Sequence, residues 1–255
     1  MILNKMTTST RKTTKYSSLL PEERLPSWIN PSIGNASQLE KVQKLVKENR
    51  LHTICEEGRC PNRGECYAAG TATFLLGGSI CTRSCAFCQV EKGKSPEKIN
   101  IFEAAKVAKA VQALDLKYVV LTAVARDDLP DHGASLFTTT MDAIRSLTPS
   151  VEIEVLTPDF WGGNNKDNND KQRERLKLVL SADPVCFNHN LETVKRLQRD
   201  VRQGATYEHS LNLLKSAREI APKIPTKSGI MLGLGEKFHE IIQHLKTLEK
   251  SIVNI

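Results

Sequence analysis

Six of the seven cysteines of this 255-residue chain lie within 34 residues and form two groups of three. The first group has spacings of four and five intervening residues, and the second has spacings of three and two. The two groups are Cys55, Cys60 and Cys66, and then Cys81, Cys85 and Cys88. A disulfide framework is typical of small secreted domains, whereas this chain is long and its first residues do not resemble a secretory signal. The pattern favours thiolates that bind metal in a reducing compartment.

The composition is that of a soluble globular protein, with 40% hydrophobic and 25% charged residues. No run of 18 apolar residues occurs, so we expect no membrane span. The net charge of +7 is spread along the chain, and we therefore expect no nucleic-acid partner.

The N-terminal region differs in composition from the rest of the chain. It is rich in Ser, Thr and Lys, and no acidic residue precedes Glu22. We interpret residues 1–35 as a leader and arm, residues 36–70 as a segment that carries the first cysteine group, and residues 71–255 as the main domain. A cytoplasmic protein is expected. If the leader is instead a transit peptide, the location is organellar.

Strand and helix patterns alternate along the chain, which predicts an α/β protein with a parallel sheet. The predicted strands cover residues 72–78, 118–124, 151–156, 184–188 and 227–234. The predicted helices cover residues 37–49, 100–114 with Asn100 as its cap, 133–147, 171–180, 191 onward, 207–220 and 238–248, and residues 162–170 form a surface loop. The strands are apolar throughout, so we expect both faces of the sheet to be covered. A (β/α) barrel, with functional residues at the carboxyl ends of its strands, fits this order.

The second cysteine group suits a [4Fe–4S] cluster, because three thiolates leave one iron free of protein ligands. A structural zinc site is the alternative, but it requires four ligands. The motif Cys81-Thr-Arg-Ser-Cys85-Ala-Phe87-Cys88 resembles that of the radical S-adenosylmethionine superfamily. The resemblance implies that Cys81, Cys85 and Cys88 are the catalytic cluster ligands. The free iron would chelate S-adenosylmethionine, whose cleavage gives a 5′-deoxyadenosyl radical, and Phe87 would lie near the adenine.

The first cysteine group lies in Leu51-His-Thr-Ile-Cys-Glu-Glu-Gly-Arg-Cys-Pro-Asn, which closely resembles the lipoyl synthase family. The likeness continues through four later segments. These are Ala125-Arg-Asp-Asp-Leu, Glu154-Val-Leu-Thr-Pro-Asp-Phe, Phe187-Asn-His-Asn-Leu-Glu-Thr and Lys227-Ser-Gly-Ile-Met-Leu-Gly-Leu-Gly-Glu236. It implies that Cys55, Cys60 and Cys66 hold a second, auxiliary [4Fe–4S] cluster, which is consumed as a sulfur source.

The resemblance also implies a sulfurtransferase that inserts two sulfur atoms at C6 and C8 of a protein-bound octanoyl group to make the lipoyl cofactor. The implied partners are octanoylated lipoyl carrier domains or the glycine-cleavage H protein, a flavodoxin- or ferredoxin-like electron donor, and an iron–sulfur carrier protein. The alternatives are another radical S-adenosylmethionine sulfur inserter, similar to biotin synthase, and a non-catalytic cluster- or zinc-binding module.

Polar residues at strand ends are the candidates for binding S-adenosylmethionine in this resemblance. They are Arg126, Asp127, Asn188, Asn190 and Glu236. Each has a simpler interpretation as a cap or turn residue, and Asn190 could cap a helix that starts at Leu191. We expect Cys186 to be a core residue. Lys227 faces either an anionic group or solvent.

One part of the family pattern is missing. The family has a sixth strand and a C-terminal extension with an Arg-Ser-Ser-Tyr motif, whose serine completes the auxiliary cluster, whereas this chain ends at Ile255 without it. We therefore expect a partial barrel of the radical S-adenosylmethionine type that lacks its last strand and extension. A truncated, inactive lipoyl synthase paralogue is a further alternative.

Overall fold

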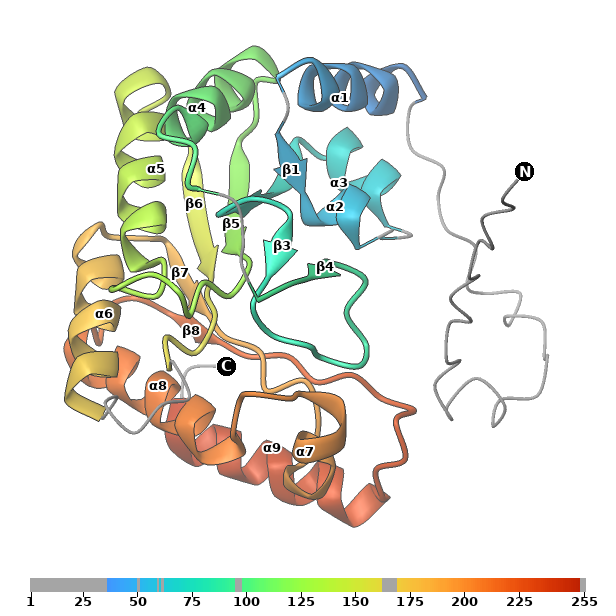
Figure 1. Ribbon diagram of the computed structural model, residues 1–255, viewed down its shortest axis with the longest axis vertical. Helices are drawn as coiled ribbons and strands as arrows, with labels where there is room; N and C mark the ends of the chain where they lie inside the picture. The colour runs from blue at the N-terminus through green and yellow to red at the C-terminus, as the bar shows by residue number, and fades with distance from the viewer. Residues whose placement is uncertain are drawn as a thin grey trace, which may run out of the picture. The chain divides into compact units, whose positions relative to one another are not determined.

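A six-stranded sheet organises the chain, with the strand order β1-β2-β5-β6-β7-β8 (Figure 1). The short strand β1 (His52–Thr53) runs antiparallel to β2 (Thr71–Leu76). The remaining neighbours pair in parallel, namely β2 with β5 (Tyr118–Ala123), β6 (Glu152–Leu156), β7 (Cys186–Asn188) and β8 (Thr226–Lys227) in turn. The five parallel strands confirm the predicted partial barrel of the α/β class.

The computed structural model describes residues 36–49, 51–58, 60, 62–94, 98–161 and 169–252. These described residues form one compact unit. The predicted leader, and the predicted loop up to residue 168, lie outside the described residues. Within the described residues, no helix is long and apolar enough to cross a membrane.

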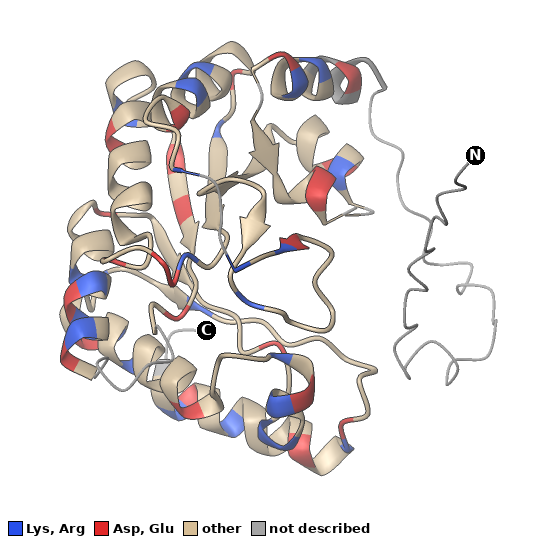
Figure 2. Ribbon diagram, viewed as in Figure 1, with Lys and Arg blue, Asp and Glu red and all other residues tan. Residues whose placement is uncertain are grey.

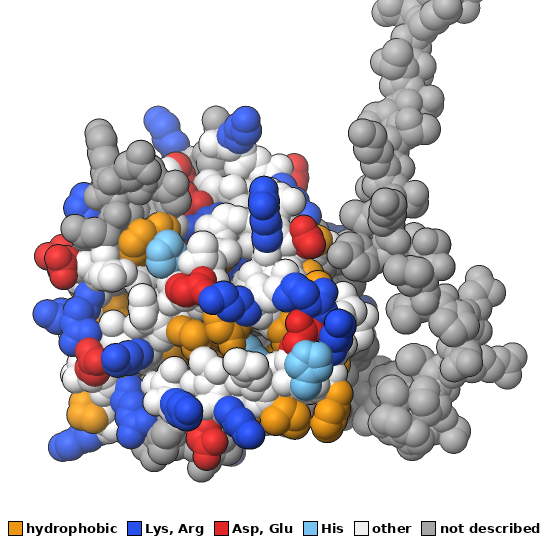
Figure 3. Space-filling view, turned by 90° about the horizontal axis from the view of Figure 1, so that it is seen from below, with side chains coloured by type: hydrophobic (Ala, Val, Ile, Leu, Met, Phe, Trp, Pro, Cys, Tyr) orange, Lys and Arg blue, Asp and Glu red, His pale blue; other side chains and the backbone are white. Residues whose placement is uncertain are grey.

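Five longer helices follow the parallel strands, and each packs against the next one along the chain. They are α4 (Glu103–Ala113), α5 (Ala134–Leu147), α6 (Asn169–Ser181), α8 (Tyr207–Ile220) and α9 (Phe238–Ile252). The N-terminal helices α1 (Ala36–Glu48), α2 (Ile54–Glu57) and α3 (Arg63–Ala68) lie beside β1 and β2 (Figure 1). Figure 3, seen from below, shows basic and acidic side chains interspersed around a band of apolar ones.

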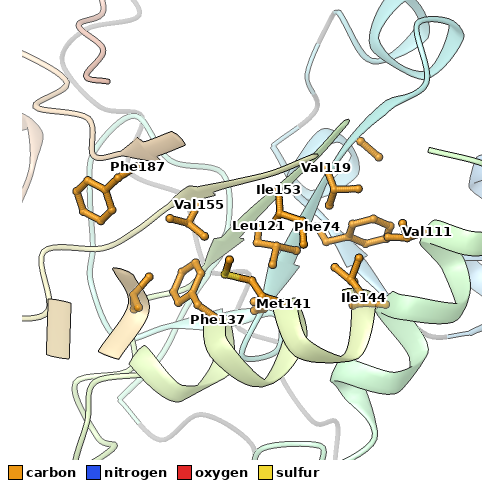
Figure 4. Packing of buried hydrophobic residues seen from close by; sticks show 14 of the residues in the cluster. Phe74, Val111, Val119, Leu121, Phe137, Met141, Ile144, Ile153, Val155 and Phe187 are labelled. Atoms are coloured by element: carbon orange, nitrogen blue, oxygen red, sulfur yellow. The ribbon is translucent and has the colours of Figure 1, made fainter. Parts of the chain in front are cut away.

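The core lies between the sheet and these helices (Figure 4). Every second strand residue points into it, because successive side chains of a strand face opposite ways. The strands contribute fully buried residues such as Phe74, Leu121, Ile153 and Phe187, and α5 contributes Met141. At about 25 cal/mol for each Å² of apolar surface removed from water, this layer is the main source of stability.

The other face of the sheet is partly open, so the expectation of two covered faces was wrong. In β5 the residues alternate, with Val119 and Leu121 buried and Tyr118 and Val120 only half-buried. Among the described residues no strand pairs with the outer side of β8, so the sheet remains an open barrel. Its inner, concave face is therefore available for a site.

Three predicted elements differ from the structure. No helix starts at Leu191, and Asn190 therefore caps none. Residues 191–194 instead lead into a 3₁₀ turn (η1, Lys195–Leu197) and the short α7 (Gln198–Val201). The strand expected over residues 227–234 ends at Lys227; after it, Ile230 forms one isolated bridge to Glu192, and Gly233 has a φ of 95°, outside the extended conformation. The helix expected from Asn100 begins at Glu103 instead. Asn100 caps only the turn before it, since its Oδ1 accepts from the Phe102 amide at 3.0 Å.

Candidate functional site

The loop that carries Cys81, Cys85 and Cys88 is closed at its base by a second, two-stranded sheet. Here β3 (Ile80–Cys81) pairs in parallel with β4 (Glu91–Lys92). Lys92 Nζ also donates to the Cys85 carbonyl at 3.0 Å. The Thr82 hydroxyl donates to the Ala125 carbonyl at 2.9 Å, which ties the loop to the carboxyl end of β5. We call residues 81–88 the Cys81–Cys88 loop.

The three thiols of this loop are half-buried, free of disulfides and close enough for each to affect the charge of the others. Backbone amides of Arg83 and Ala125 both donate to Cys81 Sγ at 3.4 Å. Burial raises the pKa of Cys85 to about 11, and the nearby Arg202 guanidinium partly offsets this effect. Iron binding must therefore displace protons from these cysteines.

This donor set fits an iron–sulfur cluster. Sulfur ligands on one loop, with amides aimed at a sulfur, are the environment that stabilises cluster thiolates. Among the described residues, no three His, Cys, Asp or Glu side chains are arranged to hold a single metal ion. A cluster spans a larger volume than one ion and needs more widely spaced thiolates.

In the first cysteine group, Cys55 lies on α2, Cys66 lies on α3, and Cys60 lies between these two helices. Thr53 begins α2, since its hydroxyl accepts from the Glu56 amide at 3.3 Å, and this cap places Cys55 in the first turn. Cys55 is buried, while Cys60 and Cys66 are half-buried. Burial raises the pKa of Cys55, and hydrogen bonds from Thr73 and Tyr67 oppose that rise. Burial raises the pKa of Cys66, and the charges of Cys55 and Cys60 add to that rise.

A small apolar cluster lies beside the second cysteine group and reaches the residue before Cys55. Leu75, Val90 and Val124 form it, and Cys81 and Cys88 pack against it. Ile54, the residue before Cys55, packs against the same cluster. Ile54 therefore brings the start of α2 to the cluster that Cys81 and Cys88 contact, while Cys55 itself belongs to the main core.

Arg126 and Asp127 follow β5, where Figure 2 shows acidic and basic residues side by side beyond the strand end. Arg126 is 2% exposed and donates to both carboxylate oxygens of Asp128 at 2.8 Å and to the Gly77 carbonyl at 2.9 Å. Asp127 accepts from Thr82 and from Arg83. Both predicted residues therefore support the loops around the site.

The other candidates reach the site from the far strands. Phe87 packs against Val194, Leu197 and Val201, as do Ile230 and Leu234 of the segment after β8. Asn188 is 6% exposed, and its amide nitrogen donates to Glu154 at 2.9 Å while its Oδ1 has no partner among the described residues.

Asn190 and Glu236 both contact the segment after β8. Asn190 lies against Gly229, where a Cβ would approach Asn190 Oδ1 to 2.8 Å. Glu236 closes its own turn by accepting from the amides of Gly233 and Leu234. The structure thus brings Phe87 together with the segment that contains Leu234. Among the described residues, Asn188 Oδ1 is the one buried side-chain atom of this set that has no hydrogen-bond partner.

Two interactions on the site were not predicted. Arg83 binds Asp127 and Asp159, and Glu154 on the inner face accepts from Tyr118, Asn188 and Lys227. Lys227 therefore faces an anionic group. Cys186 was expected in the core, but it is half-buried and near enough to Glu154 that this carboxylate raises the pKa of its thiol, after burial as the larger cause.

The comparisons with known proteins agree with this geometry. Residues 75–248 match the Radical SAM superfamily model. The chain is 69% identical to Lipoyl synthase 2 of Prochlorococcus marinus (strain MIT 9313), covering 94% of this chain and 79% of that protein. It is 70% identical to Lipoyl synthase 2 of Parasynechococcus marenigrum (strain WH8102), covering 92% and 79%. Lipoyl synthase of Thioalkalivibrio sulfidiphilus is 44% identical, over 86% of this chain and 65% of that protein.

Among solved structures, methylornithine synthase superposes with a TM-score of 0.52 at 14% identity, covering 83% of this chain and 57% of the other. A cobalamin-dependent S-adenosylmethionine radical enzyme gives 0.50 at 14% identity, covering 69% and 26%. These two likenesses show the fold alone. The superfamily match implies one [4Fe–4S] cluster and S-adenosylmethionine as cofactors. Because that match spans most of the chain and relatives about 70% identical share nearly all of it, the chain belongs to the lipoyl synthase family, the sulfurtransferases of the radical S-adenosylmethionine superfamily.

Proposed function

We propose that this chain inserts two sulfur atoms, at C6 and C8, into an octanoyl group bound to a carrier protein. The observation that carries the proposal is one apolar cluster that is contacted by Ile54, the residue before Cys55, and by Cys81 and Cys88 of the second group. A radical enzyme without sulfur transfer needs only the second group. Because Ile54 contacts the same cluster as Cys81 and Cys88, we expect both groups to serve one substrate.

The six cysteines divide into two sets of ligands on this proposal. Cys81, Cys85 and Cys88 hold the catalytic cluster, and Cys55, Cys60 and Cys66 hold the auxiliary one. When bound, the first cluster supplies the electron that cleaves S-adenosylmethionine, and the second supplies sulfur. The buried position of Cys55 excludes water from one side of its group.

The residues around the Cys81–Cys88 loop would bind S-adenosylmethionine. The unpartnered Asn188 Oδ1 is a buried acceptor at a strand end, and such an atom needs a donor. The amino groups of S-adenosylmethionine supply one. Phe87 offers an apolar face beside the segment of Ile230 and Leu234, which suits the adenine ring. Asn190 and Glu236 hold that segment in place, and Arg126 holds the loop after β5.

We take the proposed partners from the resemblance to the lipoyl synthase family. The substrate is an octanoylated lipoyl carrier domain or the glycine-cleavage H protein. Electrons come from a flavodoxin- or ferredoxin-like donor, and an iron–sulfur carrier protein restores the auxiliary cluster. We place the protein in the cytoplasm.

The test is a single-turnover assay on the anaerobically reconstituted protein with a reductant, S-adenosylmethionine and an octanoylated carrier peptide. We expect 5′-deoxyadenosine and a peptide carrying two added sulfur atoms, both measured by mass spectrometry. Cys85→Ala should abolish both products. Cys66→Ala should abolish sulfur insertion and leave deoxyadenosine formation.

Cys186→Ala is the matched control, because Cys186 belongs to neither group, and it should behave as the parent chain. Deoxyadenosine without sulfur insertion by the parent chain would refute the proposed reaction and favour a radical enzyme of another kind. Absence of both products would refute radical chemistry for this chain.

A further inference from the structure

Arg83 lies between the first two cysteines of the Cys81–Cys88 loop, yet its side chain is only 11% exposed. Its Nε donates to Asp127 Oδ2 at 2.6 Å, and its Nη2 donates to Asp127 Oδ1 at 2.9 Å. This is a two-point pairing of a guanidinium with a carboxylate, the strongest hydrogen-bonded ion pair that side chains form. Asp127 follows β5, so the pairing fixes the loop to that strand end.

A second carboxylate holds the same guanidinium. Asp159, whose side chain is 1% exposed and which follows β6, accepts from Nη2 at 3.1 Å and from Nη1 at 3.4 Å. The carbonyls of Trp161 and Gly204 accept from Nη2 and Nη1 as well. Burial alone would lower the pKa of Arg83, but the two carboxylates raise it above its usual value, so the guanidinium stays charged.

Gly204 is fitted to this side chain. It has a φ of 85°, and a Cβ at this position would lie 2.8 Å from Arg83 Cδ. The last residue of α7 also meets the loop directly, since the Ala86 amide donates to the Val201 carbonyl at 2.8 Å. One arginine therefore joins the loop to the ends of two strands and to the segment after α7.

All five N–H groups of Arg83 have acceptors within the protein, so none is left for a ligand. Both oxygens of Asp127 are likewise used, by Arg83 and Thr82. We infer that Arg83 is a positioning residue: together with Asp127 and Asp159 it sets the position of the catalytic cluster's loop relative to the S-adenosylmethionine site. The inference rests on the proposed assignment of this loop to the catalytic cluster. On this inference, Asp127 is a partner of Arg83 and does not contact S-adenosylmethionine directly.

The geometry explains why the residue is an arginine. A planar guanidinium can bond two carboxylates and two carbonyls at once, whereas a lysine ammonium has three donors and no fixed plane. Arg83→Lys therefore keeps the charge and loses the simultaneous contacts. Arg83→Gln loses both.

The test uses the reconstituted full chain, reduced with dithionite and titrated with S-adenosylmethionine while the change in its EPR spectrum is recorded. A lost hydrogen bond to a buried charge corresponds to about tenfold or more in binding. We expect Arg83→Lys to keep the iron content and melting profile of the parent chain, and to need about tenfold more S-adenosylmethionine for half of the spectral change, with a larger effect in Arg83→Gln. Arg173→Lys is the matched control, because Arg173 forms an ordinary ion pair with Glu219 at the surface.

A double-mutant comparison separates the two roles of Asp127. If Asp127 acts through Arg83, adding Asp127→Asn to Arg83→Gln should change the S-adenosylmethionine concentration for half of the spectral change only a little. Independent, additive effects of the two substitutions would show a direct contact between Asp127 and S-adenosylmethionine and would overturn that part of the inference. An unchanged titration in Arg83→Lys would overturn the positioning role. Should Arg83→Lys fail to fold, Asp127→Asn decides, and an unaltered titration in that variant overturns the inference.

The EPR titration stands apart from sulfur insertion. A chain that responds to S-adenosylmethionine but makes no dithiolated peptide fails the proposed function and leaves the role of Arg83 intact. A dithiolated product, together with an S-adenosylmethionine titration that Arg83 substitutions leave unchanged, would support the proposed function and overturn the role of Arg83.

Discussion

Lys227 Nζ lies 3.0 Å from Glu154 Oε1, and this contact joins β8, an edge strand of the sheet, to β6 across the open inner face. The Glu154 side chain is 4% exposed and also accepts from the Tyr118 hydroxyl at 2.6 Å. Burial tends to raise the pKa of Glu154, but the hydrogen bonds from Tyr118, Asn188 and Lys227 lower it overall. The carboxylate is thus ionised and fully bonded within the sheet.

Removing the lysine leaves this buried carboxylate with two neutral partners. We expect Lys227→Met to lower the free energy of unfolding by about 1–2 kcal/mol at neutral pH, less than for a fully buried pair because the lysine is 57% exposed. Urea unfolding of the cluster-free protein measures this change. Lys195→Met, which breaks the exposed pair with Glu208, is the control and should change stability by about 0.5 kcal/mol or less. Equal losses in the two variants would contradict the role of the Glu154 contact.

His189 predicts a pH dependence of stability. Its ring is fully buried between the Thr157 carbonyl and the Ser210 hydroxyl, and burial, with the neighbouring Arg202, lowers its pKa from 6.5 to about 3. Below pH 6.5, His189 is protonated in the unfolded chain but stays neutral in the folded chain. The stability that the neutral ring contributes above pH 6.5 is therefore lost progressively between pH 6.5 and about 3.

The expected slope from this residue is about 1.4 kcal/mol for each pH unit below 6.5. Urea unfolding of the cluster-free chain and of His189→Gln, compared from pH 7.5 down to pH 5, isolates it. The variant starts less stable, and its stability should fall less steeply with acid by about that amount. Parallel curves would show that His189 takes up a proton in the folded state.

Two adjacent glycines after β2 should differ in their tolerance of a side chain. Gly77 and Gly78 have φ of 84° and 92°, so alanine is strained at either position. At Gly77 the new Cβ would also lie 3.2 Å from Leu136 and 3.3 Å from Val124, whereas at Gly78 nothing lies within 4 Å. Gly77→Ala should therefore destabilise the protein more than Gly78→Ala, by about 1 kcal/mol or more, measured by thermal unfolding. Equal melting temperatures would contradict the crowding at Gly77.

The cysteine assignment predicts the iron content. Two clusters amount to about eight irons for each chain, and loss of either cysteine group should leave about four. Anaerobic iron and sulfide analysis of Cys85→Ala and Cys66→Ala measures this, with Cys186→Ala expected to retain all. A chain that binds about four irons before any substitution would contradict the second cluster, and one that binds zinc alone would contradict both.

Local sequence predicted the elements whose signals are local. The helix over residues 207–220 was found at its observed bounds, because Thr206 caps it through the His209 amide and its apolar stripe repeats at helical spacing. The segments near Leu191 and Gly229 were misassigned for a tertiary reason. Glu192 has a φ of 67°, which a helix residue does not adopt, and it forms a single bridge with Ile230 in place of a continued strand.

The features of the candidate site also divide into those that local sequence predicts and those that only the fold brings together. The two cysteine groups were evident from spacing, since the ligands of one cluster are close in sequence. The pairing of Arg83 with Asp159 joins residues 76 positions apart, and only the fold brings them together. The sequence marks both residues as candidates, because Arg83 lies inside the cysteine motif and Asp159 follows a strand. It does not show that the two residues pair with each other. Lys227 and Glu154 meet across β7 for the same reason.

The central claim is that the two cysteine groups perform different tasks, one forming the radical and the other donating sulfur. The most direct test reconstitutes the chain with ³⁴S-labelled sulfide, removes free sulfide, and weighs the octanoyl peptide product after one turnover by mass spectrometry. We predict that the parent chain and Cys186→Ala give a product with two ³⁴S atoms, and that Cys66→Ala gives deoxyadenosine but no sulfur-containing product. A product that carries only unlabelled sulfur, or an undiminished labelled product from Cys66→Ala, would contradict the account.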